Sequence, residues 1–480
     1  MNRKMNQKLN LTFKRLFIVL SITAFMWSCK MGKNYEAPDI VSPTEYRFGV
    51  DSIVTTSSDT IGWWTLIKDP ILDTLITIAL QNNQDVRVAM QRIVEAEKLY
   101  RIQKVQTRPS FDYNGSYTYG TYNGFTSPEA VSNYFGGLQM NWELDLWGKN
   151  RRLSEAAMAN YTGTVHGLRA VQLSVIANVA AAYVQLLENK ASLKVAQETL
   201  ASRDSSIIIM DARYRLGTIP EIDLNQAQIQ QAIAESAVPV YKRGVALSEN
   251  ALSVLLGENP REIVTGQALD QQQIPPVIPA GIPSDLLKRR PDLLRTEQEI
   301  VAQNANVGAA IANRFPTISL TGAAGVSSAL SIINTASGAE AAWNIGAGIV
   351  GPLFQWGKNK RKVEVEKARL EASILEYERS AIAAFQEVED ALASVQYYQE
   401  ELIARRKHVV AATNAEYLSK QRYDKGVTSY LEYLEQQRTA FEAELNLVTV
   451  QGKILTSYVQ LYKALGGGWI TREEQQQAQE

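Results

Sequence analysis

The chain has 480 residues, of which 45% are hydrophobic and 21% are charged, and its formal net charge at pH 7 is −1. A nucleic-acid binder would carry a basic surface stripe, so the near-neutral charge argues against that class of partner. The histidines, His166 and His408, lie far apart in the chain, and there is a single cysteine. The sequence shows no phosphate-binding loop, no histidine or cysteine cluster and no nucleophile with a nearby base. We therefore expect neither an enzyme nor a metal site.

The N-terminus predicts a secretory signal peptide over residues 1–28. Five basic residues and no acidic residue precede an apolar stretch that ends at Trp27 and is too short to span a membrane. Ser28 and Cys29 follow, and a cysteine directly after a small residue resembles the bacterial lipobox. That resemblance implies that Cys29 begins the mature chain and carries a covalent lipid; the alternative is a buried free cysteine. Without the five basic residues, the net charge of −1 becomes −6.

The next elements are a helix and two strands. A helix over about 72–105 ends before Pro109. Residues 111–121 and 138–146 then alternate between aromatic or aliphatic side chains on one face and polar side chains on the other. A period of two over this length predicts strands.

A very long helix follows the strands. Residues 151–214 contain no proline and are rich in Ala, Leu, Gln and Glu. At about 1.5 Å per residue this helix would be close to 100 Å long. The chain then turns at Gly217 and returns through a helix over about 222–256. Helices of this length and composition are typical of coiled coils.

The second half of the chain repeats the first. The run from Trp147 to Asn150 recurs from Trp356 to Asn359, an offset of 209, while Pro109 and Pro316 are related by 207. Such a long period indicates a duplicated domain. The repeated elements are strands over 317–322 and 343–349, a helix over 358–425, a turn at Gly426 and a helix over 431–465.

The predicted strands suit either a soluble sandwich or a membrane barrel. No segment after the signal reaches about 18 uninterrupted apolar residues, so we expect any membrane crossing to use strands. Four strands cannot close a barrel, because about eight are needed. Either the strands are soluble, or several chains combine them.

Several motifs resemble those of TolC-like outer-membrane factors, and in particular the NodT-type lipoproteins that serve RND efflux systems. The most specific is the run from Pro279 to Arg295, which continues into Phe315–Leu320. Trp63-Trp64 and Asp69-Pro70 resemble the family's N-terminal entry, and Lys33–Pro38 resembles the segment after the acylated cysteine. The resemblance covers nearly all of the chain after the signal.

The resemblance implies an α + transmembrane β fold made of a duplicated helix-strand-strand-long helix-helix unit. Three chains would give four strands each to a twelve-stranded β-barrel, and two hairpins each to a twelve-helix periplasmic α-barrel. The homotrimer would be a passive exit duct in the outer-membrane lipid. Its partners would be a periplasmic adaptor and an inner-membrane RND-type pump, with no nucleic acid.

The resemblance also implies a channel gate just after the second turn. In the family, acidic residues at the positions of Glu432 and Glu435 line the constriction, and Leu431 would add an apolar collar. Asp223 is the first-half counterpart of Glu432. Thr428 stands where some relatives carry an arginine that locks the closed state, so we expect that lock to be absent.

The turns themselves are the expected docking tip for the adaptor. The tip residues are Arg215, Leu216, Gly217 and Thr218 in the first half and Gly426 in the second. Gly217 also suits the end of a helix, because glycine readily takes the left-handed conformation found there.

The sequence divides into a signal peptide, an anchor and entry segment, two repeats joined by a linker, and a polar tail. The expected bounds are 1–28, 29–70, 71–265, 266–285, 286–466 and 467–480, with strands at about 110–147 and 316–354 and tips at about 214–223 and 423–432. Two other functions stay open from the residues: the outlet of a type I protein secretion system, and a lipid-anchored periplasmic coiled-coil scaffold.

Overall fold

The computed structural model describes residues 30–49, 62–120, 131–275, 283–327, 340–468 and 474. The expected signal peptide and Cys29 lie outside these residues. The chain divides into two compact units, and helices pass from one to the other. Unit 1 contains Met1–Asp39, Ile93–Thr164 and Thr296–Tyr377; unit 2 contains Ile40–Arg92, Val165–Arg295 and Glu378–Glu480.

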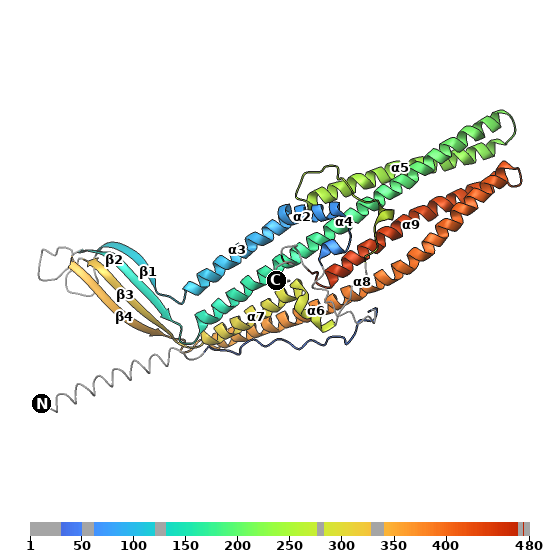
Figure 1. Cartoon of the computed structure of the whole chain (residues 1–480). Helices are drawn as coiled ribbons and strands as arrows, with labels where there is room; N and C mark the ends of the chain where they lie inside the picture. The colour runs from blue at the N-terminus through green and yellow to red at the C-terminus, as the bar shows by residue number, and fades with distance from the viewer. Residues whose placement is uncertain are drawn as a thin grey trace, which may run out of the picture. The chain divides into compact units, whose positions relative to one another are not determined.

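Unit 1 contains one antiparallel sheet of four strands (Figure 1). The strands are β1 Ser110–Gly120, β2 Val131–Leu144, β3 Thr317–Ser327 and β4 Glu340–Val350, in the order β1-β2-β3-β4. The two hairpins, one from each repeat, therefore join through β2 and β3. The outer edges of β1 and β4 have no strand partner among the described residues.

Strand β2 starts seven residues earlier than the alternation predicted, at Val131 instead of 138. Gly136 and Gly137 interrupt the alternation of apolar and polar side chains, which hides the strand in the sequence. The structure explains one of these glycines: a Cβ atom on Gly137 would lie 2.5 Å from the Ala324 carbonyl oxygen. Glycine here lets the backbones of β2 and β3 approach closely.

The helix predicted over 72–105 is in fact two helices, α2 Pro70–Asn82 and α3 Gln84–Val105. Asn83 separates them, because its side-chain oxygen accepts hydrogen bonds from the backbone N–H groups of Asp85 (2.9 Å) and Val86 (3.3 Å). This is an N-cap, which starts a new helix. The spacing of apolar residues continues across Asn83, so the sequence pattern did not indicate the break between the two helices.

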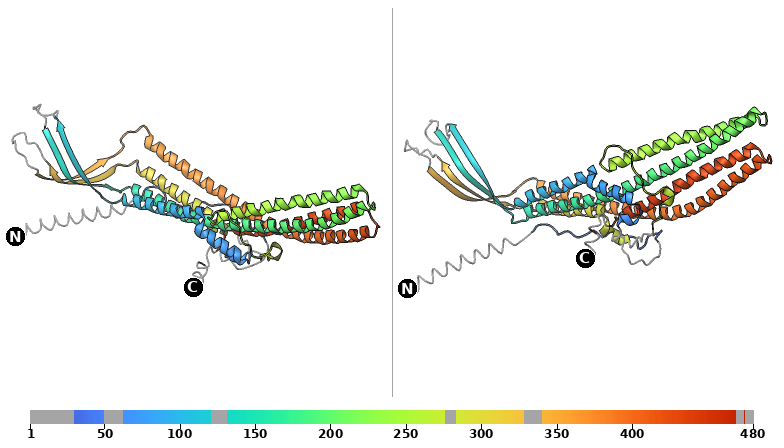
Figure 2. Two further views of the ribbon diagram at one scale, coloured as in Figure 1. Left: turned by 90° about the horizontal axis from the view of Figure 1, so that it is seen from above. Right: turned by 45° about the horizontal axis from the view of Figure 1, so that its top comes forward.

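The long helices confirm the duplication. Helix α4, Lys149–Arg215, and helix α8, Lys358–Asp424, have 67 residues each, and their return helices α5, Glu221–Leu255, and α9, Tyr430–Ala464, have 35 each. Both views in Figure 2 show α4 beside α5 and α8 beside α9. The shorter elements are η2 Trp63–Thr65, η3 Leu269–Gln271, α6 Pro283–Arg289 and α7 Pro291–Ala312.

A buried carboxylate joins three segments within unit 2. Asp69 is fully buried and caps α2 by accepting a hydrogen bond from the Ile71 N–H at 3.0 Å. Its other oxygen accepts hydrogen bonds from the Tyr183 hydroxyl (2.7 Å) and the Gln272 side-chain amide (3.0 Å). The Tyr183 hydroxyl accepts from the Gly266 N–H at 2.9 Å. A buried carboxylate must be fully hydrogen-bonded, and this one ties α2 and the linker to α4.

Among the described helices, only α4 has the length and the apolar composition that a membrane-spanning helix needs. Its most apolar window of 18 residues has a mean hydropathy of 1.6 and is 56% buried inside the chain. Such burial is what a core helix shows, so this window is weak evidence for a membrane crossing.

Candidate functional site

The two hairpin turns are built alike. Gly217 and Gly426 have φ values of 67° and 71°, and no heavy atom would lie within 4 Å of a Cβ atom added to either. The Gly217 N–H donates to the Tyr214 carbonyl at 2.8 Å, and the Thr218 N–H donates to the Arg213 carbonyl at 3.0 Å. This pair of bonds is the Schellman ending of a helix, which needs a left-handed residue and so favours glycine. The conformation, and not crowding, requires glycine here.

The residues predicted for the docking tip lie on the surface at the first turn. Leu216 is 78% exposed, and the Arg215 side chain is also exposed, with a 2.9 Å ion pair to Asp211. The Thr218 hydroxyl donates to the Arg213 carbonyl at 2.8 Å and so belongs to the helix ending. At the second turn Val427 is 66% exposed. Each turn thus presents one apolar side chain to solvent.

The ends of the two hairpins pack together within unit 2. Met210, Leu224, Tyr430 and Tyr433 belong to one buried cluster that draws on α4, α5 and α9. The Arg213 guanidinium lies 5.3 Å from the centre of the Tyr423 ring and 3.8 Å from Asp424. A cation over an aromatic face is attracted to it. The first hairpin is therefore attached to the second near the turns.

The carboxylates predicted for the gate are paired with arginines. Glu432 accepts a hydrogen bond from the Thr428 hydroxyl and forms a 3.2 Å ion pair with Arg422. Glu435 receives two hydrogen bonds of 2.8 Å from one nitrogen of Arg438. Every partner comes from the same hairpin, so the two carboxylates are locally neutralised.

The structure brings only some of the predicted gate residues together. Leu431, which is 60% exposed, and Glu435 line a hollow of about 160 Å³ with Gln226 of α5. Neither Glu432 nor Asp223 lines this hollow. Asp223 is half-buried near the start of α5, where its charge helps to raise the pKa of Tyr430, mainly a result of burial.

Sequence reasoning missed both arginines. Arg438 follows Glu435 by three residues on one helix, a spacing that brings side chains together, so the sequence carried a signal for that pair. Arg422 and Glu432 lie on different helices across a turn, and no local spacing predicts their contact. Thr428 stands at the position where some relatives carry the locking arginine. Its hydroxyl group donates a hydrogen bond to Glu432.

A set of charged groups lies between α4, α8 and α9, of which Arg203 is buried and Glu416 and Glu444 are half-buried. Arg203 is 5% exposed, and its Nη1 atom has no hydrogen-bond partner among the described residues. Burial lowers the pKa of Arg203 and raises the pKa of Glu416, although each charge favours the ionised form of the other. Burial also raises the pKa of Glu444, and the charges of Glu416 and Glu198 raise it further. Periodicity predicts only that these faces are packed, and not which charges they contain.

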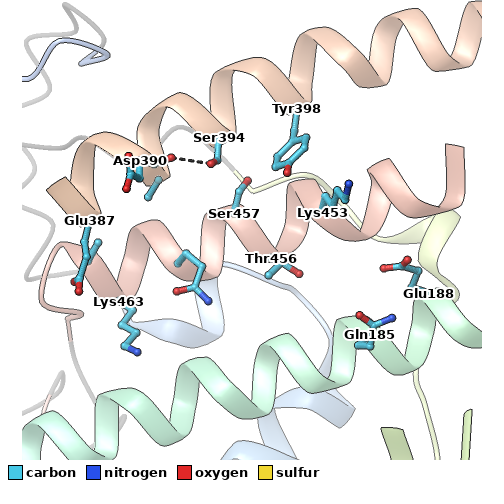
Figure 3. Close-up of a pocket in the computed structure, with 13 residues that line it drawn as sticks. Gln185, Glu188, Glu387, Asp390, Ser394, Tyr398, Lys453, Thr456, Ser457 and Lys463 are labelled. Atoms are coloured by element: carbon cyan, nitrogen blue, oxygen red, sulfur yellow. Dashed lines mark hydrogen bonds between the residues drawn. The ribbon is translucent and has the colours of Figure 1, made fainter. Parts of the chain in front are cut away.

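A polar cavity of about 550 Å³ lies among α4, α8 and α9 in unit 2 (Figure 3). Lys453 is 5.8 Å from the centre of the Tyr398 ring, and burial raises the pKa of Glu188. Glu387, at one end, is paired with Arg290 at 2.6 Å. The cavity mixes charges of both signs and contains none of the predicted gate or tip residues. Its lining consists of Gln185, Glu188, Glu387, Asp390, Ala391, Ser394, Tyr398, Lys453, Thr456, Ser457, Gln460, Lys463 and Ala464.

The segment after Cys29 is held within unit 1 by Arg152, which the sequence did not single out. Arg152 is fully buried and donates to the carbonyl oxygens of Met31 (2.8 Å), Gly32 (2.9 Å) and Lys33 (3.1 Å). It also pairs with Glu155 at 3.0 Å. Within the described ranges, no three His, Cys, Asp or Glu side chains gather as metal ligands.

Comparison with known proteins gives the family. The model of the outer membrane efflux protein family matches residues 75–258 and 282–467. The chain is 34% identical to the antibiotic efflux pump outer membrane protein ArpC of Pseudomonas putida, over 96% of this chain and 97% of that one. It is 30% identical to the cation efflux system protein CusC of Escherichia coli, over 92% and 96% of the two chains.

A solved structure shows the same fold. The outer-membrane channel OprN has a TM-score of 0.84 and 28% identity, with 92% of this chain and 100% of that chain covered. The resemblance noted in the sequence is thereby confirmed, as are the duplicated fold and the expectation of a channel instead of an enzyme. The chain belongs to the outer membrane efflux protein family, whose members form the outer-membrane channels of efflux pumps.

Proposed function

We propose that three copies of this outer-membrane efflux protein close into one passive exit duct. An inner-membrane RND-type pump would deliver the substrates through a periplasmic adaptor. The relatives are named for antibiotic, toluene and cation efflux. One channel architecture thus serves chemically different cargoes, which supports a duct that leaves the choice of substrate to the pump.

The observation that carries the proposal is the sheet with two open edges. Its four strands pair only as β1-β2-β3-β4, and one of its faces is rich in exposed aromatic and aliphatic side chains. In lipid, the unpaired backbone groups of β1 and β4 would each cost several kcal/mol. Closure with strands from other copies removes both edges, and three copies supply enough strands for a barrel. The exposed apolar residues are Phe111, Tyr113, Tyr117, Tyr119, Leu138, Trp343, Ile345 and Ile349.

Two exposed apolar stripes on the helices of unit 2 support the same assembly. On α5, Ile233, Val240, Leu247 and Val254 are all exposed and follow one another at intervals of seven. On α8 the stripe is Ile403, Val410 and Tyr417, which are exposed and also follow one another at intervals of seven. Heptad spacing is what packing between neighbouring helices requires. Two different stripes on one chain allow head-to-tail contacts that close a ring.

The lipid anchor is also part of the proposal. The lipid on Cys29 would tie the mature N-terminus to the outer membrane. Lys30 pairs with Glu155, and Arg152 binds the carbonyl groups of the following residues. An anchored and docked N-terminus would keep unit 1, which contains the sheet, at the bilayer.

We place the gate at Glu432, Glu435 and Leu431, with Asp223 in the first repeat, and the adaptor tip at the two turns. Threefold symmetry would gather the carboxylates and their arginines into rings. The Arg422–Glu432 pair joins the end of α8 to the start of α9. Because each ring would contain carboxylates and arginines, its net charge would be small. The closed state would then depend on the ion pairs between them as well as on repulsion between like charges.

Conductance in planar bilayers tests the duct and its gate together. Wild-type protein should migrate on gels as a heat-modifiable trimer and show small channels. Glu432→Ala with Glu435→Ala should raise the single-channel conductance and shift the selectivity toward anions, because Arg422 and Arg438 lose their partners. The matched control, Glu400→Ala with Glu401→Ala on α8, should leave both properties unchanged.

Two outcomes would count against the proposal. A heat-insensitive monomer without channel activity would support a lipid-anchored scaffold. A channel whose conductance and selectivity do not change in the double variant would remove Glu432 and Glu435 from the gate.

A further inference from the structure

A basic hollow lies in unit 1, where helix α8 starts. It has a volume of about 710 Å³ and is lined mainly by α7 and the first turns of α8. Its basic side chains are Lys358, Arg361, Lys362 and Arg369, and its single acidic side chain is Glu366. Positive charge is therefore in excess around the basic hollow, which favours an anion as its occupant.

Two of the lysines in the basic hollow have no ionic partner. Glu366 is already held by Arg369 at 2.8 Å and by the side-chain amide of Gln303 at 2.6 Å. Among the described residues, neither Lys358 nor Lys362 forms an ion pair. These two ammonium groups are therefore available to a ligand from outside the chain.

The first repeat shows how similar cations are neutralised at the start of α4. Lys149 pairs with Glu143, at the end of β2, at 2.5 Å. The Arg151 side chain pairs with Asp145 at 3.3 Å. Asp145 also accepts hydrogen bonds from the backbone N–H groups of Asn150 (3.1 Å) and Arg151 (2.9 Å). Two carboxylates thus lie at the positive end of this helix, where negative charge is stabilising.

The second repeat keeps the cations and replaces both acids. By the repeat offset of 209, Pro352 and Phe354 stand at the positions of the two carboxylates. Lys358 stands at the position of the paired lysine, and Lys362 at that of an apolar residue, Leu153. The start of α8 therefore carries more positive charge than the start of α4 and lacks the two carboxylates that neutralise it there.

The basic hollow begins directly beyond the end of the sheet. Asn313, which lines it, comes four residues before Thr317, the first residue of β3, and Lys358 comes eight residues after Val350, the last of β4. Strands β3 and β4 have 11 residues each. A tilted strand needs about 9 to 11 residues to cross the hydrocarbon of a bilayer. With the sheet in the outer membrane, the basic hollow lies at the level of the periplasmic headgroups.

Exposed apolar side chains mark the same level. Leu353, Phe354 and Trp356, which lie between β4 and α8, are all exposed. The rings of Phe354 and Trp356 contact each other with their centres 4.6 Å apart. Aromatic side chains gather where the hydrocarbon of a membrane meets the headgroups. Apolar residues followed by cations thus match the order of hydrocarbon and headgroup in a bilayer.

We infer that the basic hollow binds the phosphate of an anionic phospholipid from the periplasmic leaflet of the outer membrane, with Lys358 and Lys362 as its main contacts. Lysine binds phosphate as a point charge and donates hydrogen bonds to its oxygens. The lipid supplies at the start of α8 the negative charge that two carboxylates supply at the start of α4. The inference rests on the proposed placement of the sheet in the membrane and adds one lipid site in each copy.

Native mass spectrometry of the full-length trimer in detergent, titrated with phosphatidylglycerol, tests the site. The trimer should bind up to three of these lipids, more tightly than phosphatidylcholine with the same acyl chains. Lys358→Ala with Lys362→Ala should weaken the binding of phosphatidylglycerol at least about tenfold, because each cation near an anionic lipid contributes roughly a factor of five. Lys358→Arg with Lys362→Arg keeps the charge and should preserve the binding.

A control on the same helix separates the site from general attraction to the surface. Lys360→Ala with Lys367→Ala removes the same charge, and neither lysine lines the basic hollow. This variant should bind phosphatidylglycerol like the wild type. An equal loss in the two alanine variants would overturn the site. Inorganic phosphate that displaces the lipid at equal concentration would overturn the assignment to a lipid.

The outcomes separate this inference from the function on which it rests. Heat-modifiable, conducting trimers that bind phosphatidylglycerol and phosphatidylcholine equally well would overturn the lipid site and leave the exit duct in place. A heat-insensitive monomer without channel activity would overturn the proposed function and the lipid site with it.

Discussion

At the scale of single residues, Arg152 shows how a buried charge can organise a chain terminus. Its guanidinium is fully buried and bonds to three carbonyl oxygens of the N-terminal segment. Gly32 and Gly308 allow this approach: a Cβ atom on Gly32 would lie 2.8 Å from Gly308 Cα, and one on Gly308 would lie 2.8 Å from Arg152 Nε. Arg361 is the counterpart of Arg152 in the second repeat, and its side chain is 77% exposed. Two equivalent arginines thus have opposite surroundings.

We predict that Arg152→Met releases the N-terminal segment. Removing one partner from a buried, hydrogen-bonded charge network typically costs about 3 to 5 kcal/mol, because the remaining groups stay unsatisfied. The trimer should dissociate at a lower temperature on gels, and a protease should cleave sooner after residue 30. Arg361→Met is the matched control and should change little, since exposed ion pairs are weak. Equal sensitivity of the two variants would contradict a clamp at Arg152.

At the scale of elements, the contact between α8 and α9 places two half-buried carboxyl groups, those of Glu416 and Glu444, close together. Glu444 of α9 is faced by Glu416 of α8 and Glu198 of α4, and burial together with these charges raises its pKa above the ordinary value of 4.5. Arg203 faces Glu416 and partly offsets its charge. Protonation of Glu444 therefore favours the packing of these helices.

We predict that Glu444→Gln raises the thermal midpoint of the protein at pH 7.5. The raised pKa means that the folded state binds a proton on Glu444 more tightly than the unfolded state does. The stability gained from this protonation is fully present below pH 4.5 and is lost as the pH rises through the pKa that Glu444 has in the folded protein. Glutamine keeps the neutral form at all pH values. The difference between variant and wild type, followed by circular dichroism, should shrink as the pH is lowered toward 4.5. Glu442→Gln, on the exposed face of α9, is the control; a gain that does not depend on pH would contradict the prediction.

At the scale of the whole molecule, the chain is incomplete by itself. It exposes two sheet edges, an aromatic sheet face and two heptad stripes. Proteins that function as monomers in water usually cover such edges and carry polar residues in place of such apolar patches. The stripes on α5 and α8 lie on different hairpins, so each copy can offer one stripe to each neighbour. In the proposed trimer, assembly would be the step at which the exposed apolar surface of this chain is buried.

We predict that Leu247→Asp weakens the trimer without unfolding the hairpin. Leu247 is 60% exposed, so aspartate there meets water in a single copy but would be desolvated between two copies. The fraction of heat-modifiable trimer should fall at a given protein concentration, with the helical circular dichroism signal unchanged. Ala246→Asp introduces the same charge at the adjacent exposed position outside the stripe and should assemble normally. Trimers of equal stability in both variants would exclude this stripe from the interface.

Local patterns in the sequence determined the elements, the duplication and the family of this protein. Alternation predicted the strands, long proline-free runs predicted α4 and α8, and glycine at 217 and 426 predicted the turns, because each depends on neighbouring residues. The proposed gate and tip came from the family resemblance and stay predictions.

Only the tertiary structure decided the contacts between distant residues. It showed that Asn83 divides a helix, that Arg152 binds residues 31–33, and that Arg422 neutralises Glu432. The Asn83 break depends on two hydrogen bonds to its side-chain oxygen that compete with the helix, and the other two contacts join segments on different elements. Periodicity records which face of an element is packed, whereas the fold alone determines which side chain meets it.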